Sequence, residues 1–405
     1  MKPISISLSP NTEPDDVLLA LKLLFQPWRW KRGKALDDLE YEFAEYLGVN
    51  SAVSFNSGRS ALTAILSALG FEKGDEILLQ AFTCNAVPNP VLWEGLKPVY
   101  VDCREDDYNM DAEDLEQKIT QKSRAVIVQH TFGLPADLEK IQSICQKHNL
   151  VLIEDCAHAL GAKYQGKLVG TFGKVAFFSF SRDKVISSVY GGMAVTSDPG
   201  LAKRLRGFQQ EVGYPSLFWI KQQLGHPLLM NWLILPTYSL LGKYLLVLFQ
   251  ILHVLSKAVH WKEKRGEKPG YFPKALPNAL ALLALHQLSK LERFNQHRKK
   301  IAEFYSRELN IHIPKEGSIF LRFPVRHKKA HEIISNAWKQ NLLIGDWYTT
   351  SIAPHDTRLE AMGYREGMCK NAETLSRETL NLPTHINISL EHAKTIITFL
   401  RQYGG

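Results

Sequence analysis

Two residues that could together serve a covalently bound cofactor lie at or just beyond the ends of apolar segments typical of β-strands. Asp155 ends the run LVLIED (150–155), and Lys184 comes just beyond VAFFSF (175–180). A carboxylate fixed at a strand end can pair with a pyridinium nitrogen, and a desolvated lysine amine can form a Schiff base with an aldehyde. These are two of the groups that pyridoxal 5′-phosphate (PLP) requires from a protein, and the lysine can afterwards act as general base and acid.

A place for the phosphate of such a cofactor lies earlier in the chain. The sequence NSGRS (56–60) separates a predicted strand from a predicted helix. Free N–H groups and the helix dipole favour an anion at such a point. Gly58 allows the backbone to approach closely, and Ser179 and Ser181 could add hydroxyl donors. Each feature alone is also explained by a turn, a helix cap or a surface charge, so the prediction depends on the whole set.

The elements that must position these residues alternate along the chain. From about residue 35 to 212, helical segments alternate with short, almost wholly apolar runs. This pattern predicts an α/β fold with a mostly parallel sheet covered on both faces, in which ligands bind at the carboxyl ends of the strands. The predicted strands are SAVSF (51–55), DEILLQAF (75–82), KPVYVDC (97–103), RAVIVQH (124–130), LVLIED (150–155), VAFFSF (175–180) and GGMAVTSD (191–198).

The character of the sequence changes after residue 212. Residues 213–262 are rich in Leu, Trp and Phe and contain no Asp or Glu. Two prolines interrupt the longest uncharged run (222–242), which argues against a clean membrane-spanning helix. Four lysines and three tryptophans favour instead peripheral membrane contact through residues 219–262. A helical hairpin buried in a dimer interface or over the active site is the alternative.

The chain thus divides into three predicted parts. Residues 1–212 form a large PLP-binding domain, 213–269 an apolar insertion, and 270–405 a linker helix with a small α/β domain. One long amphipathic helix is predicted to begin near Leu276 and to continue to Leu309. A strand at 318–325 and helices near 330–340 and 390–403 complete the small domain.

Composition narrows the class of partner. The five cysteines are scattered without metal-ligand spacing, and the N-terminus lacks a signal-peptide pattern, so a reduced, cytoplasmic protein without a metal site is expected. The net charge of +8 fits solubility alone, a phosphorylated substrate or an anionic membrane surface. Nucleic acid is disfavoured, because no basic helix with interleaved aromatic residues is present.

Several blocks resemble, in the correct order, the DegT/DnrJ/EryC1/StrS family of PLP-dependent sugar aminotransferases. They are GDEILLQAFTCNAVPNPVLWEGLKPVYVDC, NMDAEDLEQKIT, VQHTFGLPADLEKI, IEDCAHALGAKYQGKLVGTFGKVAFFSFSRDK and CKNAETLSRETLNLPTH. The resemblance covers roughly residues 35–210 and 270–400. It implies the fold-type I architecture, an amino-acid donor (glutamate), a keto sugar that is nucleotide-linked, and a homodimer that shares its active site.

Residue by residue, the resemblance implies that Lys184 is the Schiff-base lysine and Asp155 the partner of the pyridinium. His158 takes the position beside the cofactor ring. The implied phosphate contacts are the hydroxyl of Ser179 and the backbone of Arg59 and Ser60. Some relatives carry histidine in place of the lysine and are dehydratases, so Lys184 favours transamination.

The sequence departs from the family at three places. Cys84 follows Thr83 where the family has an aromatic residue that stacks on the cofactor, and Tyr190 replaces an acidic residue. The stretch GYFPKALPN replaces GYNYR, so that only Lys274 or Asn278 could supply its phosphate contact. Candidate substrate-side contacts are Arg182, Asp183, His130 and Tyr348.

The leading hypothesis is therefore a PLP-dependent aminotransferase acting on a keto sugar. The altered positions at Cys84 and Tyr190 motivate an alternative, a membrane-associated PLP-binding sensor or scaffold without turnover. A PLP-dependent sugar dehydratase is a third hypothesis, which the retained lysine disfavours. If the insertion meets a membrane, the sugar could be lipid-linked.

Overall fold

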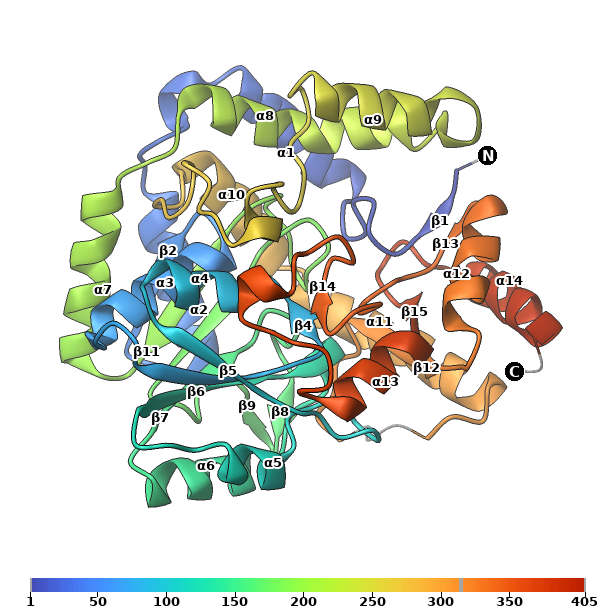
Figure 1. Ribbon diagram of the computed structural model, residues 1–405. Helices are drawn as coiled ribbons and strands as arrows, with labels where there is room; N and C mark the ends of the chain where they lie inside the picture. Colours follow the sequence, from blue (N-terminus) through green and yellow to red (C-terminus); the bar gives the residue numbers. More distant parts are fainter. Residues whose placement is uncertain (1, 313–315, 404–405) are drawn as a thin grey trace.

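The computed structural model describes residues 2–312 and 316–403 and is built around a seven-stranded sheet (Figure 1). The strand order is β2-β11-β10-β7-β6-β3-β5. Strand β11 is antiparallel to both neighbours, and every other pairing in this sheet is parallel. In chain order the strands are β2 (Ser51–Phe55), β3 (Glu76–Gln80), β5 (Lys97–Val101), β6 (Ser123–Gln129), β7 (Val151–Asp155), β10 (Val175–Ser179) and β11 (Gly192–Thr196).

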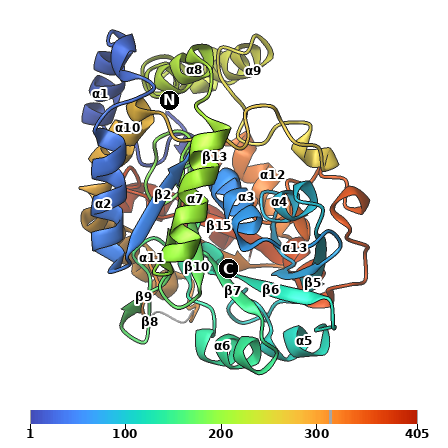
Figure 2. The same ribbon diagram turned by 90° about the vertical axis from the view of Figure 1, so that its left-hand side faces the viewer.

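Helices cover both faces of this sheet, which is why its strands are apolar on both sides. One face packs on α3 (Gly58–Leu69), α4 (Pro88–Trp93) and α7 (Pro199–Val212). The other packs on α2 (Ala35–Leu47), α5 (Ala112–Gln117), α6 (Leu138–Lys147) and α10 (Asn278–Leu288). Figure 2 shows α2 and α3 on opposite sides of the sheet. The predicted α/β fold is confirmed.

The single long helix predicted from Leu276 to Leu309 is wrong. Two helices occupy this stretch, α10 and α11 (Leu291–Glu308). At the break, the Ser289 hydroxyl donates to the carbonyl of His286 at 2.8 Å. The ammonium group of Lys290 lies 2.7 Å from Asp15 Oδ1 at the start of α1 (Pro14–Leu24). These side-chain contacts fall where periodicity alone gives no signal for a helix end.

The C-terminal part pairs β12 (Arg322–Arg326) with β15 (Thr379–Pro383) in an antiparallel ladder. The strand predicted at 318–325 begins only at Arg322, because Phe320 has a φ of 52°, which an extended strand does not allow. Strand β14 (Ile352–Ala353) pairs with β4 (Thr83–Cys84) and joins this part to the large sheet domain. The surrounding helices are α11, α12 (Ala330–Lys339), α13 (Lys370–Glu378) and α14 (Leu390–Leu400).

The apolar insertion is a helical hairpin at the top of the molecule in Figure 1. It consists of α8 (Leu217–Leu228), the π-helical turns η3 (Leu229–Ile234) and η4 (Tyr238–Gly242), and α9 (Lys243–Ile251). Helix α8 packs along α1. Among the described residues, no single helix is long and apolar enough to cross a membrane. The pair Leu217–Ile234 and Tyr238–Ile251, bent by 109°, passes the same test together, by length and composition only.

Candidate active site

A cavity of about 180 Å³ lies at the carboxyl ends of β7 and β10, beside the start of α3. The loop 346–355 of the C-terminal part and residues 258–259 at the end of the insertion complete its wall. The parallel sheet therefore gathers side chains from distant parts of the sequence at one edge. The predicted site residues that line this cavity are Gly58, Arg59, Asp155, His158, Ser179 and Lys184.

Asp155 is the last residue of β7 and is 4% exposed. Its Oδ1 accepts a hydrogen bond from the amide of Ala157 at 2.9 Å, and no described residue donates to Oδ2. Burial raises the pKa of Asp155 to about 6, against the opposing effects of the Ala157 amide and of the Lys184 charge. A buried carboxylate with one free oxygen is suited to bind a cationic ring N–H.

Lys184 projects its amine over the ring of Trp347, with Nζ 4.4 Å from the ring centroid. Burial lowers the pKa of Lys184, and the charge of Arg322 lowers it further, while Asp183 and Cys84 oppose the shift. A lowered pKa enlarges the fraction of neutral amine, which is the form that attacks a carbonyl carbon.

Two residues that sequence reasoning did not single out complete the surroundings of Lys184. The guanidinium carbon of Arg322, on β12, lies 3.2 Å from the ring centroid of Trp347, which belongs to the loop 346–355. Arg322 Nη2 also pairs with Asp183 Oδ2 at 3.0 Å. Both residues lie more than 130 positions from Lys184 in the sequence. Only the docking of the C-terminal part on the sheet brings them to the lysine.

His158 forms part of the cavity wall as a neutral ring. Its Nδ1 accepts a hydrogen bond from the amide of Phe132 at 3.3 Å, so the ring proton is assigned to Nε2, 3.5 Å from the hydroxyl of Tyr348. Burial, together with the charges of Lys184 and Arg322, holds the pKa of His158 well below its usual value. The ring stacks on Trp347 with a centroid separation of 4.9 Å.

The start of α3 provides an anion site made of backbone groups. Ser57 caps the helix, because its hydroxyl accepts from the amide of Ser60 at 3.0 Å. The amides of Gly58 and Arg59, in the first turn of this helix, have no acceptor among the described residues. A Cβ added at Gly58 would lie 3.0 Å from Cβ of Ser179, so a larger residue would fill this space.

The structure does not support the predicted role of Ser60. Its amide is used by Ser57, its hydroxyl donates to Asn56 Oδ1 at 2.7 Å, and it does not line the cavity. The guanidinium of Arg59 is bound by the carboxylate of Glu263 and donates to the carbonyl of Ala258 at 2.8 Å. The side chain of Arg59 is thus committed to the insertion, which leaves its amide for an anion.

Two of the three departures from the family, Tyr190 and the stretch with Lys274 and Asn278, make structural contacts in this chain. The hydroxyl of Tyr190 donates to the carbonyl of Lys257 at 2.5 Å. Lys274 Nζ donates to the carbonyl of Val212 at 2.7 Å, and Asn278 Nδ2 to that of Arg29 at 2.7 Å. Within the described chain, none of these three residues lines the cavity, whereas Cys84 does.

The candidate substrate-side contacts separate into two groups. Asp183 and Tyr348 line the cavity. Arg182 donates to the carbonyl of Ser256 at 2.7 Å and lines an adjoining cavity under the insertion. His130 is fully buried on the other face of the sheet, where it does not reach the cavity.

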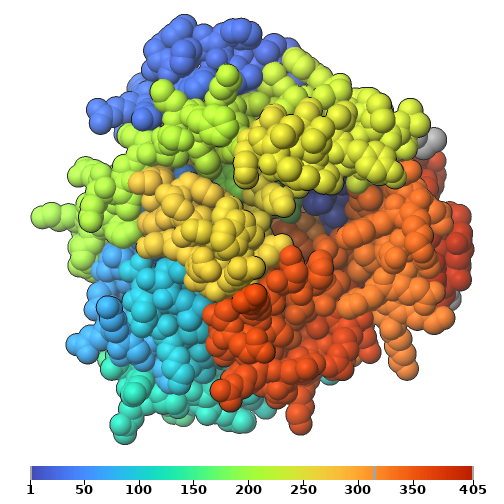
Figure 3. Space-filling view, turned by 45° about the horizontal axis from the view of Figure 1, so that its top comes forward, coloured from blue at the N-terminus to red at the C-terminus, as the bar shows by residue number. Residues whose placement is uncertain are grey.

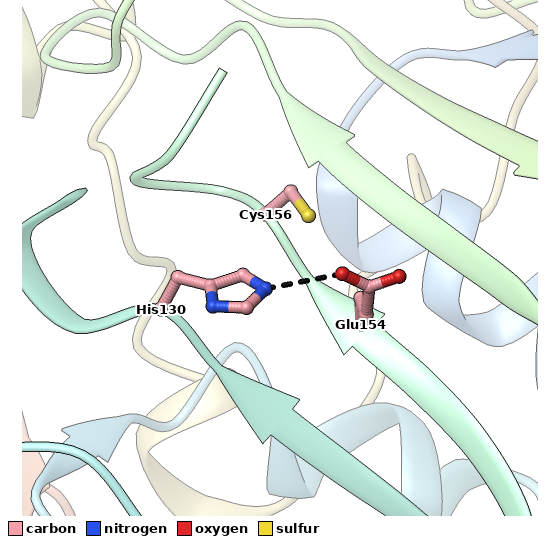
Figure 4. Close-up of side chains that lie close together, drawn as sticks. All are labelled: His130, Glu154 and Cys156. Atoms are coloured by element: carbon pink, nitrogen blue, oxygen red, sulfur yellow. Dashed lines mark hydrogen bonds and ion pairs between the residues drawn. The ribbon is translucent and has the colours of Figure 1, made fainter. Parts of the chain in front are cut away.

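His130, Glu154 and Cys156 lie close together (Figure 4). Their arrangement resembles a metal site, but the side-chain atoms of His130 and Glu154 already make hydrogen bonds within the protein. Glu154 accepts from the amides of Gly170, Phe172 and Gly173 at 2.7 Å each and from His130 Nε2 at 3.3 Å. Burial alone would raise the pKa of Glu154, but these donors hold it below its usual value. The group therefore anchors the loop after β9 (Lys167–Leu168) to the sheet.

The cavity residues fit PLP in charge and in space. Asp155 leaves one carboxylate oxygen free, Lys184 presents a desolvated amine, and Gly58 keeps a cradle open beside two unpaired amides. These three features are the acid, the amine and the phosphate site that the cofactor requires. The fold and the site define the class of fold-type I PLP-dependent transferases.

Comparison with known proteins identifies the family. The chain belongs to the DegT/DnrJ/EryC1/StrS aminotransferase family, whose sequence model matches residues 13–233 and 243–401. The resemblance inferred from the sequence is confirmed. The prediction that PLP is the cofactor is confirmed with it. The match omits residues 234–242, at the bend of the insertion.

Individual relatives agree with this assignment. GDP-perosamine synthase of Escherichia coli O157:H7 is 40% identical over 182 residues, 45% of this chain and 50% of that protein. UDP-N-acetyl-3-dehydro-alpha-D-glucosamine 3-aminotransferase of Acidithiobacillus ferrooxidans is 41% identical over 189 residues, 44% of this chain and 51% of that protein. The chain thus spans about half the length of these relatives. Helicobacter pylori PseC, an aminotransferase involved in the biosynthesis of pseudaminic acid, has the same fold, with a TM-score of 0.76 at 24% identity over 99% of both chains.

Proposed function

We propose that this sugar aminotransferase moves an amino group from an amino acid, with glutamate as the expected donor, to the keto group of a nucleotide-linked sugar. Lys184 is the residue that carries PLP. The observation that supports this proposal is that one cavity brings together the Lys184 amine, the Asp155 carboxylate and the unpaired amides at the start of α3.

The roles of the residues follow from their environment. When bound, PLP supplies the electron sink that amino-group transfer requires. Lys184 Nζ, with a pKa that burial lowers, is suited to release and accept the protons that move during transfer. Asp155 would hold a positive ring nitrogen, and the amides of Gly58 and Arg59 with the Ser179 hydroxyl would hold the phosphate. His158 stays neutral, is held by stacking on Trp347, and would contact the cofactor ring from the cavity wall.

The choice of a nucleotide-linked sugar draws on the relatives and on charge. One of the two relatives above is named for a GDP-linked sugar and the other for a UDP-linked sugar. The net charge of +8 favours the approach of such an anionic substrate. We further propose a homodimer, which light scattering after size-exclusion chromatography would test.

The visible absorbance spectrum of the purified holoenzyme tests the proposal. We expect a PLP band that glutamate bleaches and a keto-sugar nucleotide restores. Borohydride followed by peptide mapping should place the cofactor on Lys184. Lys184→Ala should lose the fixed cofactor, whereas Lys174→Ala, at a surface pair 3.5 Å from Asp198, should retain it.

The alternatives give different results in the same experiment. A band that no amino acid changes would favour the sensor or scaffold hypothesis. Loss of water from the sugar without transfer of nitrogen would favour a dehydratase. Cofactor fixed to another lysine would overturn the assignment of Lys184.

A further inference from the structure

We propose that the insertion docks the protein on an anionic lipid membrane, with α9 lying parallel to the membrane surface in its interface. The docking face consists of the exposed apolar residues between Leu217 and Trp261. Figure 3 shows residues 213–262 spread over the top of the molecule beside the N-terminal segment. This inference is independent of the proposed substrate.

The docking face is far more apolar than an ordinary protein surface. No residue of α9 is buried, although the helix reads KYLLVLFQI. Leu240 is 76% exposed and Ile251 64%. Of the 21 large hydrophobic residues exposed in the described chain, 13 lie here: Leu217, Phe218, Trp232, Leu233, Leu240, Leu241, Tyr244, Val247, Leu248, Ile251, Leu252, Val254 and Trp261. A concentration of this size marks an interaction surface.

The hairpin holds this face outward on a packed support. Helix α8 buries Trp219, Ile220 and Leu224 in the core that it shares with α1 and α10. At the tip, Leu246 and Phe249 of α9 pack on a separate small core of Met230, Ile234, Leu235 and Leu255. Helix α9 is thus held in place by packing on one side, while its other side is exposed.

Charge distinguishes a membrane from a second copy of this chain as the occupant. Residues 213–262 contain no acidic residue, and Lys221, Lys243 and Lys257 are exposed around the apolar residues. Lysine is depleted in the contact cores of protein interfaces. Lysines beside exposed Trp232 and Trp261 are instead typical of segments that lie in the interface of an anionic membrane.

The bend excludes a straight crossing of the bilayer by this segment. The two halves of the hairpin meet at 109°, and η4 follows Pro236 at the turn. The turn falls in residues 234–242, which the family model does not match. An interfacial position allows both halves to keep their contacts with the protein, whereas insertion across the bilayer would expose the polar groups of α8 to lipid.

The docking face is also connected to the active-site cavity. Residues 256–257, near the C-terminal end of the insertion, are hydrogen-bonded to the loop that carries Lys184. Arg182 donates to the carbonyl of Ser256 at 2.7 Å, and Tyr190 donates to that of Lys257 at 2.5 Å. The next residue, Ala258, lines the cavity itself. Docking would therefore hold the active-site cavity close to the membrane surface, because only this short segment separates the two.

Co-sedimentation of the full-length holoenzyme with vesicles tests the proposal. We expect binding to vesicles of phosphatidylcholine mixed with phosphatidylglycerol, at least tenfold weaker binding to phosphatidylcholine alone, and weakening by salt. The triple variant Leu241→Glu, Val247→Glu, Ile251→Glu should lose at least tenfold in binding to the mixed vesicles. The control Trp338→Glu, Met368→Glu, Leu390→Glu adds the same charge at exposed apolar residues elsewhere and should lose much less.

A second variant separates the electrostatic from the apolar contribution. Lys221→Gln, Lys243→Gln, Lys257→Gln should reduce the preference for anionic vesicles while keeping the apolar face. An unchanged PLP spectrum in every variant confirms folding. Equal vesicle binding by the triple glutamate variant of the insertion and its control would overturn the proposal. Absence of vesicle binding by the wild type would overturn it too. If the triple glutamate variant of the insertion then also had a lower sedimentation coefficient than the wild type, the face would be a contact between two copies of the chain.

Discussion

Glu154 and Asp155 are neighbours in the sequence, but their carboxylates face opposite sides of strand β7. Asp155 pairs in register with Phe177 and lines the active-site cavity, while Glu154 pairs with Ala176 and binds His130 behind the sheet. The alternation of side chains along a strand gives the two acids different environments and opposite pKa shifts. Substitutions at these adjacent positions should therefore have different effects.

Asp155→Asn should weaken PLP binding and remove a pH dependence of the apoprotein. The loss of a charged hydrogen bond of about 1.5–3 kcal/mol corresponds to roughly 10–100-fold in affinity. The pKa of Asp155 is raised by burial from 3.8 to about 6 in the folded protein. The contribution of this group to stability is therefore full below pH 3.8 and is lost as the pH rises through 6. Melting of both apoproteins between pH 5 and about 7 should show the wild type falling relative to the variant.

The same pKa predicts how cofactor affinity depends on pH. Because the ionised carboxylate is the form that holds a cationic ring nitrogen, the wild type should bind PLP less tightly as the pH falls below about 6. Titration of PLP absorbance at several pH values measures this effect. The asparagine variant corrects for the titration of the cofactor itself, and equal slopes for both proteins would contradict the assignment of Asp155.

Glu154→Gln should lower stability while leaving the PLP spectrum intact. The amide group of glutamine would face backbone donors that now bind the carboxylate, at a loss of about 3 kcal/mol. Urea unfolding followed by far-UV circular dichroism measures this loss. A chelator should not change the unfolding of the wild type. Destabilisation by the chelator would show that His130, Glu154 and Cys156 hold a metal ion.

Gly58→Ala should reduce PLP affinity, because the added Cβ would lie 3.0 Å from Ser179 in the phosphate cradle. Gly207→Ala is the matched control: this exposed glycine lies inside α7, and an added Cβ meets nothing within 4 Å. The control should keep its affinity and gain up to about 1 kcal/mol in stability from helix propensity. Equilibrium dialysis of PLP compares the two variants, and equal affinities would contradict a phosphate site at the start of α3.

The sequence indicated those features that depend on short stretches. The strand ends at Asp155 and Ser179, the turn at Gly58 and the position of Lys184 are local, and the cavity contains all four. What the sequence could not show depends on side chains that meet across long separations. Trp347 and Arg322 approach Lys184 only after the C-terminal part docks on the sheet. The amide of Ser60 donates to the capping hydroxyl of Ser57, so it is not available to a phosphate. The end of α10 likewise depends on Lys290 meeting α1.

Glu263→Ala should detach the end of the insertion from the active site. Glu263 is fully buried, and its carboxylate binds the guanidinium of Arg59, which is 8% exposed. Removing one partner of a buried pair leaves an uncompensated charge, a loss of about 3–5 kcal/mol. The Arg59 side chain would then keep only its hydrogen bond to the carbonyl of Ala258 and could turn into the cavity, so PLP binding should also weaken. Limited proteolysis should cut the variant within residues 257–268 much faster than the wild type. Glu267→Ala removes an exposed acid from the same segment and should behave as the wild type, whereas equal protection of all three proteins would contradict a tethering role for this ion pair.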